Sequence, residues 1–470
     1  MSLNGIAGTA ISALKTNSAA LGVVANNVSN LNTAGYARRV VNQQTLSVGG
    51  QLMGVNIASV QRVASQFLMQ EMLSAGGTNA QYSTMGSLFS QLNGLLGAPG
   101  DNQSLATGLT NLSAAFATAS QAPTSSASRT AVMNALNNLA GNFSSVFSTV
   151  SQMQSQTDQQ VVGSIDSTNA LLKQVFDLNQ QIRNATVSGD TASGLLDQRD
   201  TALTSLSETL GIRTTQQPDG SVIVATADGV NLVSNTYAQL SYTGGAQNGT
   251  YGNIMVQDIN PATGAPLGGP MALDPHLAGG SLKGLIDMRD QVLGGLSQTL
   301  GNLAQQTAQA FNAQANANAA FPPPAALSGR NTGLLGGDAL NFTGKTTIAV
   351  TGQDGTLISR IDVDFGPPSL LSVDGGAPIS AGSTVGGFAA ALNSALGANG
   401  SASFVDGKLS ISASGGNGIL VQDDASAPSA RGGTGFSQFF GLNDLFQSQM
   451  PSVTATGLSA TDASGLAAGG

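Results

Sequence analysis

The stretch LNGIAGTAISALKTNSAALGVVANNVSNLNTAGYARR (Leu3–Arg39) opens with an apolar spacing that alternates between four and three residues. The nine positions are Leu3, Ala7, Ala10, Leu14, Asn17, Leu21, Val24, Val28 and Leu31. This is the a/d pattern of a coiled-coil seam, in which one polar residue, Asn17, sets the register at a cost in stability. An ordinary amphipathic helix within its own domain is the alternative. The neighbouring sequence offers no partner helix, which favours the seam.

The end of the same stretch is rich in asparagine. Four asparagines fall within seven residues: Asn26, Asn27, Asn30 and Asn32. Asparagine is poor inside helices but suits caps, local backbone hydrogen bonds and left-handed geometry. We expect Gly35 to close the helix with a positive φ and Tyr36 to anchor the exit, with Arg38 and Arg39 meeting acids or carbonyls of a partner. Neutral amides can hydrogen-bond without burying charge, so we interpret the segment as a joint at a subunit boundary, not as a ligand-binding loop.

The composition bounds the class of protein. The chain has 470 residues, of which 41% are hydrophobic and only 9% are charged. This length predicts two to four domains, with thin cores built on small side chains. No run of about 18 apolar residues is present, so no transmembrane helix and no membrane insertion are predicted. The N-terminus also lacks the compact apolar region of a secretory signal.

Charge is distributed unevenly along the chain. Residues 1–70 contain four cations and no acid, which gives them a charge of +4. Because the whole chain has a net charge of −9, the remaining residues carry −13. The four cations are Lys15, Arg38, Arg39 and Arg62. An acid-free segment on an acidic chain predicts that the segment is buried against another surface. Nucleic acid is excluded as a partner by the pI of about 4.4 and by the absence of a basic aromatic patch.

The periodicity predicts a multidomain α+β fold that is mainly α: a long N-terminal helix plus an elongated helical bundle, with a β-rich subdomain and a separate mainly-β outer module. The predicted segments are an N-terminal helix and connector at 1–64, a helical bundle at 65–320 with a β insertion at about 212–277, a mainly-β module at 335–433, and a return segment with a disordered tail at 434–470.

Several local signals support these boundaries. The connector at 40–62 is extended and contains glycines, which is typical of a β-hairpin. Pro123 breaks the first helical region, and Asp219-Gly220 is a hairpin turn signal within the insertion. A second four-three pattern is formed by Val161, Ile165, Thr168, Leu172, Val175, Asn179 and Ile182. Helix is predicted again at 281–319, before the proline stop FPPPAA (Phe321–Ala326), and one helix at about 384–396 interrupts the β module.

An internal repeat carries paired carboxylates. GLLDQRDTALTSLSETLG (Gly194–Gly211) and GLIDMRDQVLGGLSQTLG (Gly284–Gly301) match at 11 of 18 positions with an offset of 90. The shared charged residues are Asp197, Arg199 and Asp200, repeated as Asp287, Arg289 and Asp290. Paired acids could perform acid–base or metal chemistry. Because catalysis does not ordinarily need two copies, we interpret the acids as complementing a helix dipole, and the arginines as pairing with neighbouring acids or capping carbonyls.

The sequence contains no recognisable catalytic apparatus. The chain has one histidine, His276, and no cysteine. This argues against a zinc cluster, a Cys–His pair and a Ser–His–Asp triad. The Gly344-Lys345-Thr346 tripeptide suggests a phosphate-binding loop, but the glycine required five residues earlier is Ala339. We therefore predict that the protein is not an enzyme, with no catalytic residues, no cofactor and no metal site.

The N-terminal residues resemble a known family. SLNGIAGTAISALKTNSAALGVVANNVSNLNTAGYARR (Ser2–Arg39) is similar to the signature of the axial proteins of the bacterial flagellum, which are the rod, hook and hook-associated proteins. Ala34 stands where many members have proline. Further matches lie at 54–72, 128–143, 195–207 and 279–290, and together they resemble the hook-associated proteins that connect hook and filament. The likeness covers residues 1 to about 320, whereas the β module is similar only in general style to outer domains of such proteins.

The resemblance implies a structural function outside the cell. It implies export by the flagellar type III apparatus with a chaperone, assembly as a ring of like subunits under the flagellar cap, and contacts with hook protein and hook-associated protein 3. Residues 1–39 would line the inner tube, the bundle would form the next shell, and the β module would face outward. The implied assembly interface consists of Leu3, Leu14, Asn17, Leu21, Val24, Asn26, Asn27, Val28, Asn30, Leu31, Asn32, Gly35, Tyr36 and Arg38.

One departure and two alternatives stay open at this point. Family members end in a second heptad helix that packs on the first, whereas this sequence ends at Gly470 in a small-residue tail. We therefore expect a fragment or a truncated product. The chain could be another axial protein, hook protein or hook-associated protein 3, although the pair LLDQRD and GGSLKGLIDMRD argues against both. The β module could make it a surface adhesin or glycan-binding protein, or could contain a hydrolase. A hydrolase would need convergent acids, whereas the acids of this module, such as Asp362, Asp364, Asp423 and Asp424, are scattered.

Overall fold

The computed structural model describes residues 3–33, 35–48, 51–97, 100–101, 104–189, 191–246 and 250–447. These residues form two compact units, one drawn from 1–121 and 127–300 and the other from 122–126 and 301–470. The chain contains both helices and several separate sheets, which confirms the predicted multidomain α+β class. The tail predicted to be disordered, from 448 onward, lies outside the described residues. No helix in the described ranges is long and apolar enough to cross a membrane.

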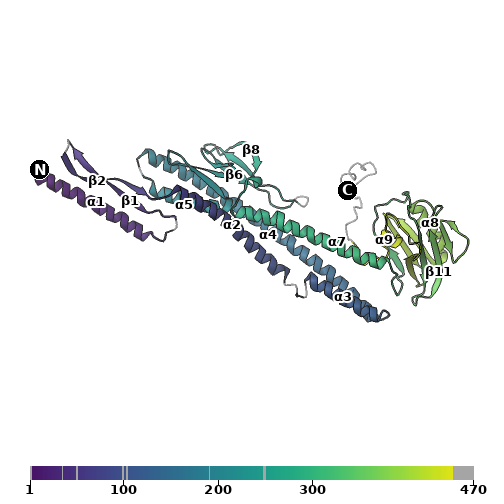
Figure 1. The fold of residues 1–470 in the computed structure, drawn as a ribbon. Helices are drawn as coiled ribbons and strands as arrows, with labels where there is room; N and C mark the ends of the chain where they lie inside the picture. Colours follow the sequence, from purple (N-terminus) through teal and green to yellow (C-terminus); the bar gives the residue numbers. More distant parts are fainter. Residues whose placement is uncertain are drawn as a thin grey trace. The chain divides into compact units, whose positions relative to one another are not determined.

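The first unit begins with a helix beside a hairpin. Helix α1 (Leu3–Ser29) lies along the antiparallel strands β1 (Arg39–Val48) and β2 (Gln51–Arg62), as Figure 1 shows. Thr16 on the covered face is buried and its hydroxyl donates to the carbonyl of Val55 at 3.0 Å. A side chain at Gly54 would lie 2.1 Å from the Ser12 hydroxyl, so this glycine permits the close contact. We call α1, β1 and β2 the N-terminal unit.

The neighbouring sequence supplies α1 with a packing partner that is a β-hairpin and not a second helix. The predicted hairpin is present, and it covers the polar face of α1 that carries Ser12 and Thr16. The apolar seam is on the other side of the helix. Small hydroxyl side chains allow the backbones of the helix and the strand to approach closely, and they hydrogen-bond across the contact.

Four helices form the bundle that follows. They are α2 (Gln66–Leu96), α3 (Leu105–Gln121), α4 (Ser126–Val187) and α5 (Ser193–Leu210). The predicted break at Pro123 falls between α3 and α4, whereas the break after α2, at Gly97, was not predicted. All seven positions of the second four-three pattern, from Val161 to Ile182, are buried on α4. Four of the seven, Val161, Ile165, Leu172 and Val175, belong to the apolar core of the first unit.

The β insertion is a six-stranded antiparallel sheet in the order β3 to β8. Its strands are β3 (Ile212–Gln216), β4 (Val222–Thr226), β5 (Asn231–Val233), β6 (Tyr237–Ser241), β7 (Met255–Ile259) and β8 (Pro266–Ala272). The predicted turn at Asp219-Gly220 joins β3 to β4. Val222, Val224 and Val233 are buried in the same core as the helices, so the sheet packs directly on the bundle.

The predicted helix at 281–319 is present from Gly280 to Asn316, but it is not α-helical throughout. A short 3-10 turn, η1 (Asp274–His276), precedes α6 (Gly280–Ile286), which leads into a π-helical segment, η2 (Asp287–Leu293), and then into α7 (Gly294–Asn316). The π-helical segment contains the charged residues of the second repeat. Irregular turns of this kind within α-helices often mark places where a side chain has a special task.

The second unit contains the β module. A five-stranded sheet has the order β13-β12-β11-β10-β16, and a three-stranded sheet has the order β14-β15-β9. The elements are β9 (Ala326–Ser328), β10 (Lys345–Thr351), β11 (Leu357–Asp364), β12 (Leu370–Val373), β13 (Ile379–Ser380), α8 (Val385–Leu396), η3 (Gly397–Asn399), β14 (Gly400–Val405), β15 (Lys408–Ala413), β16 (Gly418–Asp423) and α9 (Phe436–Phe440). The helix expected at about 384–396 is α8, and Thr384 caps it.

The segment after residue 433, assigned from the sequence to the return of the chain, supplies core side chains to this module. Phe436 and Phe440 on α9 are fully buried and lie 5.5 Å and 5.9 Å from Phe342, measured between ring centroids. The segment then binds α7 within the same unit. The side-chain oxygen of Asn312 accepts from the backbone nitrogens of Leu445 and Phe446, both at 2.8 Å. The core of the module is therefore completed by residues that follow its last strand in the sequence.

We predict that Phe436→Ala lowers the free energy of unfolding of the second unit by about 3–5 kcal/mol, because it removes a ring from the centre of an aromatic cluster and leaves a cavity. The matched control is Val405→Ala in the same module, where the side chain is 62% exposed and an effect within about 0.5 kcal/mol is expected. Denaturant unfolding of the two variants measures this difference. Equal midpoints would show that α9 is not part of the core.

Candidate functional site

The asparagine-rich stretch forms a joint within the chain. The side-chain oxygen of Asn27 accepts from the Tyr36 hydroxyl at 2.8 Å and from the Arg39 nitrogen at 2.9 Å. Its side-chain nitrogen donates to the carbonyl of Arg39 at 2.8 Å. The side-chain amide of Asn27 thus binds both the backbone nitrogen and the carbonyl of Arg39, the first residue of β1. A neighbouring β-strand would form the same pair of hydrogen bonds. The end of α1 and the start of the hairpin are held together at this point.

Gly35 and Tyr36 shape the turn between these two elements. Gly35 has a φ of 78°, as predicted, and a side chain there would lie 2.1 Å from the Thr201 hydroxyl on α5. The Tyr36 ring lies under the Arg39 guanidinium, with 5.2 Å between the guanidinium carbon and the ring centroid. Gly35 is therefore needed both for its backbone conformation and for the close approach to α5.

Two arginines of the hairpin bind the two acids of the first repeat. Arg62 donates to Asp197 at 2.7 Å and to Asp200 at 2.5 Å, and Arg39 donates to Asp197 at 3.0 Å. The Ala37 nitrogen also lies 3.3 Å from an Asp197 oxygen. Arg39 and Arg62 are opposite each other in the register of the hairpin, so both reach the same end of α5. We call these four side chains the arginine–aspartate clamp.

The clamp corrects two expectations from the sequence. Arg39 was expected to meet a partner subunit, but it binds Asp197 of its own chain. Asp197 and Asp200 were expected to complement the dipole of a helix start, but α5 begins at Ser193 and its first turn contains no acid. The signal that could have shown the pairing is charge balance: the acid-free first 70 residues hold arginines, and the repeat holds acids.

The repeated arginines have matching positions in the first unit. Arg199 donates to the carbonyl of Gly220 at 2.7 Å and to the side-chain oxygen of Asn179 at 3.4 Å. Arg289 donates to Asp158 at 2.9 Å and to the Tyr242 hydroxyl at 2.5 Å. Asn179 and Asp158 both belong to α4, and Gly220 and Tyr242 both belong to the β insertion region. Each copy of the repeat therefore links α4 to the insertion, and the arginines bind acids and a carbonyl as the sequence predicted.

The remaining acids of the second repeat bind locally. Asp287 pairs with Lys283 and accepts from the side chains of Gln81 and Gln291, both at 3.2 Å. Asp290 forms two bonds with Arg289, at 2.7 Å and 2.9 Å. In the first copy of the repeat the two acids bind the hairpin. In the second copy the equivalent acids bind residues within the helical bundle.

The electrostatics of these arginines follow from burial and pairing. Burial lowers the pKa of Arg199, whose guanidinium binds a carbonyl and an amide oxygen, and the charge of nearby Asp200 offsets this only in part. Burial also opposes the charge of Arg289 and of Arg62, but the neighbouring aspartates outweigh it and raise the pKa of both guanidinium groups. Burial and the hydrogen bond to Asp158 raise the pKa of the Tyr242 hydroxyl, which therefore stays neutral and donates.

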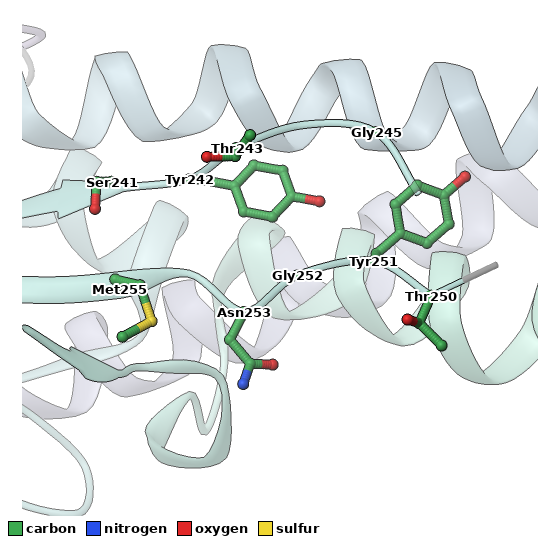
Figure 2. A pocket seen from close by; sticks show the side chains of 9 residues that line it. All are labelled: Ser241, Tyr242, Thr243, Gly245, Thr250, Tyr251, Gly252, Asn253 and Met255. Atoms are coloured by element: carbon green, nitrogen blue, oxygen red, sulfur yellow. The ribbon is translucent and has the colours of Figure 1, made fainter. Parts of the chain in front are cut away.

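A cavity of about 340 Å³ lies beside Arg289, between the ends of β6 and β7. Its lining residues are Ser241, Tyr242, Thr243, Gly245, Thr250, Tyr251, Gly252, Asn253 and Met255. The guanidinium carbon lies 4.5 Å from the Tyr251 ring centroid. Figure 2 shows that Asn253 and Met255 point away from the two tyrosine rings. The polar groups do not converge and Arg289 is already bound to two carboxylates, so the geometry favours a structural contact over a ligand site.

The seam of α1 is uncovered. Eight of its nine positions have described side chains, and all eight are exposed, with 72% for Leu14, 68% for Leu21 and 79% for Leu31. Asn26, Asn32 and Arg38 are exposed as well, and Asn30 is half-buried. The side chain of Leu3 lies outside the described residues. A contiguous row of large apolar side chains on one helix face is typical of a protein–protein interface.

The sequence-predicted residues therefore fall into separate groups. Asn27, Gly35 and Tyr36 belong to the internal joint, and the acids and arginines of the repeat hold the first unit together. The exposed seam remains the candidate assembly surface. Among the described residues, no three histidine, cysteine or acidic side chains are grouped so as to bind a metal ion. The residues that sequence reasoning missed are Arg62, Asp158 and Tyr242, which become visible only as partners of the repeat.

We predict that Asn27→Ala destabilises the N-terminal unit by about 1–3 kcal/mol, because two partly buried backbone groups of Arg39 lose their partners. Hydrogen exchange of the β1 amides measures the effect, and faster exchange is expected. Asn26→Ala is the matched control because the Asn26 side chain is exposed. Equal protection in the two variants would contradict the role given to Asn27.

We predict that Arg289→Ala lowers the free energy of unfolding of the first unit by about 3–5 kcal/mol, because it leaves the buried carboxylate of Asp158 without its cation. Lys173→Ala removes an exposed ion pair with Asp177 on the same helix as Asp158, and a change below about 1 kcal/mol is expected there. Denaturant unfolding compares the two variants. A smaller effect for Arg289→Ala than for Lys173→Ala would be inconsistent with the bridging role.

Comparisons with known proteins give a consistent result. The profile described as flagellar hook-associated protein FlgK helical domain matches residues 89–321, and the profile of the flagella basal body rod protein matches residues 8–36. The chain is 29% identical over 375 residues to flagellar hook-associated protein 1 of Escherichia coli K12, covering 75% of this chain and 66% of that protein. It is 31% identical over 313 residues to the protein of the same name from Salmonella typhimurium, covering 65% of this chain and 55% of that protein.

A solved structure is also similar. The flagellar hook junction protein FlgK from Burkholderia pseudomallei matches 80% of this chain and 66% of its own, with a TM-score of 0.48 and 22% identity. The matched part of the chain spans 66% and 55% of the length of the two curated relatives named above. The two family profiles together cover the seam from Ala10 onward, the asparagine-rich stretch up to Tyr36, most of the bundle and the β insertion.

Proposed function

The chain belongs to the family of the flagellar hook-associated protein FlgK, and from this premise we propose that it is a structural subunit of the junction that connects the flagellar hook to the filament. The flagellar type III system would export it, and like subunits would assemble as a ring outside the cell. The observation that carries the proposal is the exposed apolar seam of α1 in a segment without acids.

The seam has the physical properties of an assembly surface. Burying a leucine or valine side chain contributes about 1.5–3 kcal/mol, so a row of them on one helix supplies a large driving force for packing against other helices. Asn17 lies in the middle of the row, where a polar residue selects one register. Since acids are absent from the first 70 residues, close packing of several copies buries no repelling carboxylates.

The proposed interface is narrower than the sequence predicted. It retains the exposed residues, which are Leu14, Asn17, Leu21, Val24, Asn26, Val28, Leu31, Asn32 and Arg38. Asn27, Gly35 and Tyr36 are assigned to the internal joint instead, because their contacts are within the chain. Leu3 and Asn30 stay as candidates at the edge of the surface.

We assign the protein a structural and not a catalytic role, in keeping with a family of flagellar structural proteins. The acids of the β module support this assignment because each is engaged locally. Asp362 pairs with Arg360 at 2.8 Å and Asp364 with Lys345 at 3.1 Å. Asp423 accepts from Ser429, and Asp424 accepts from the backbone of its own turn. We propose that this module faces outward as a spacer.

The proposed partners are other copies of the chain, hook protein on one side and hook-associated protein 3 on the other. The flagellar cap would cover the ring during assembly, and a chaperone would accompany export. These partners follow from the family, and the seam of α1 is the surface of this chain that supports contacts of this kind.

We predict that Leu21→Asp prevents incorporation of the chain into flagella, because a carboxylate in the seam would have to be buried on assembly. Leu335→Asp in the β module is the matched control, since both leucines are highly exposed, at 68% and 73%. Labelled chains would be expressed in cells that lack their own junction protein, and flagella would be imaged. Equal incorporation of both variants would contradict the role of the seam as the assembly surface. Label along the hook or the filament would contradict the location of the chain at the junction.

A further inference from the structure

The N-terminal unit is joined to the rest of the chain by one covalent crossing. The chain leaves β2 at Arg62 and enters α2 at Gln66, so residues 63–65 are the only link. Val63, Ala64 and Ser65 are all exposed. The Val63 nitrogen donates to the carbonyl of Arg38 in the N-terminal unit at 2.8 Å, and Ser65 caps α2, so each end of the linker is bound only to the side that it adjoins. An exposed three-residue linker without core contacts leaves the direction of the unit free unless another contact fixes it.

The apolar core does not fix that direction. The buried cluster of the first unit begins at Leu73, with Met69 packed against its edge, and it contains no described residue of the N-terminal unit. Among the described residues, the unit is instead hydrogen-bonded to the bundle through Ala37, Arg39 and Arg62, which bind the two acids of α5. Gly35 also lies close to Thr201 of α5.

The geometry of these contacts is directional. Asp197 receives bonds from both strands of the hairpin and from the turn before it, and Arg62 spans Asp197 and Asp200. The four side chains are between 10% and 25% exposed, and their formal charges sum to zero. Charge-assisted bonds from a planar guanidinium to two carboxylates restrict rotation more than an apolar contact of the same size.

The N-terminal unit is also held together independently of the clamp. Asn27 binds the first residue of β1, and Ser12 and Thr16 bind Val55 of β2. The β1–β2 ladder extends from Arg39 to Arg62. Loss of the clamp would therefore leave the helix and hairpin associated, and the charged groups that it exposes would be hydrated by water.

We propose that the arginine–aspartate clamp is a detachable joint: Arg39 and Arg62 on Asp197 and Asp200 set the direction of α1 relative to the bundle. When the clamp opens, the N-terminal unit turns as one body about residues 63–65. The clamp is thus the positioning device for the exposed seam of α1. The proposal concerns the orientation of the unit and does not depend on the junction role.

Spin-label distances test the proposal on the full chain. Because the sequence contains no cysteine, labels can be placed at two exposed serines, Ser18→Cys on α1 and Ser167→Cys on α4. With the clamp intact, a single narrow distance distribution is expected. Asp197→Asn combined with Asp200→Asn removes both acids, and loss of the narrow distribution is expected.

The control and a second readout separate release from unfolding. Asp177→Asn removes an exposed acid of α4 that pairs with Lys173, and it should leave the narrow distribution unchanged. Hydrogen exchange of the β1 and β2 amides should stay slow in the double variant, because the unit keeps its own contacts. A narrow distribution that persists in the double variant would overturn the proposal, as would loss of protection in the hairpin.

Discussion

The buried face of α4 is the constraint on which the first unit depends. Its four-three stripe from Val161 to Ile182 is covered along its length, and side chains from α2, α5 and the β insertion belong to the same apolar cluster. Because the stripe is continuous, separate elements can pack against different positions along this one long helix. The two repeated arginines then fasten the insertion to that helix at two points, through Asn179 and Asp158.

Where the apolar core ends, polar side chains take over the connections. The hairpin is held to α5 by arginines and aspartates, and the segment after α9 is held to α7 by Asn312. A chain with 61 glycines and only 4% aromatic residues has few large side chains to bury at every junction. Hydrogen bonds and ion pairs supply direction at such places, although each contributes little net stability. This division leaves the apolar seam of α1 exposed, as the proposed assembly role requires.

Much of the fold could be predicted from local patterns. The spacing on α4, the alternation in β4 and the turn at Gly220 all act through neighbouring residues, and each appears in the structure. The candidate site was predicted only in part. The importance of Asn27 was visible in the sequence, but its partners were not: it binds Arg39 of its own chain, where a neighbouring subunit was expected. The acids of the repeat were also visible, while their arginine partners lie 135 to 158 residues away along the chain.

The residues alone were sufficient to predict most of the helices and strands, the apolar seam and the family, since periodicity and short motifs depend on near neighbours. They could not show which face of α1 is covered. The hairpin lies on the hydroxyl-bearing face, and the apolar face stays exposed, because Thr16 and Gly54 let the backbones approach closely. They also could not show that Phe436 completes the β module. Both outcomes depend on which distant surfaces meet, and that is decided by packing in three dimensions and not by spacing along the chain.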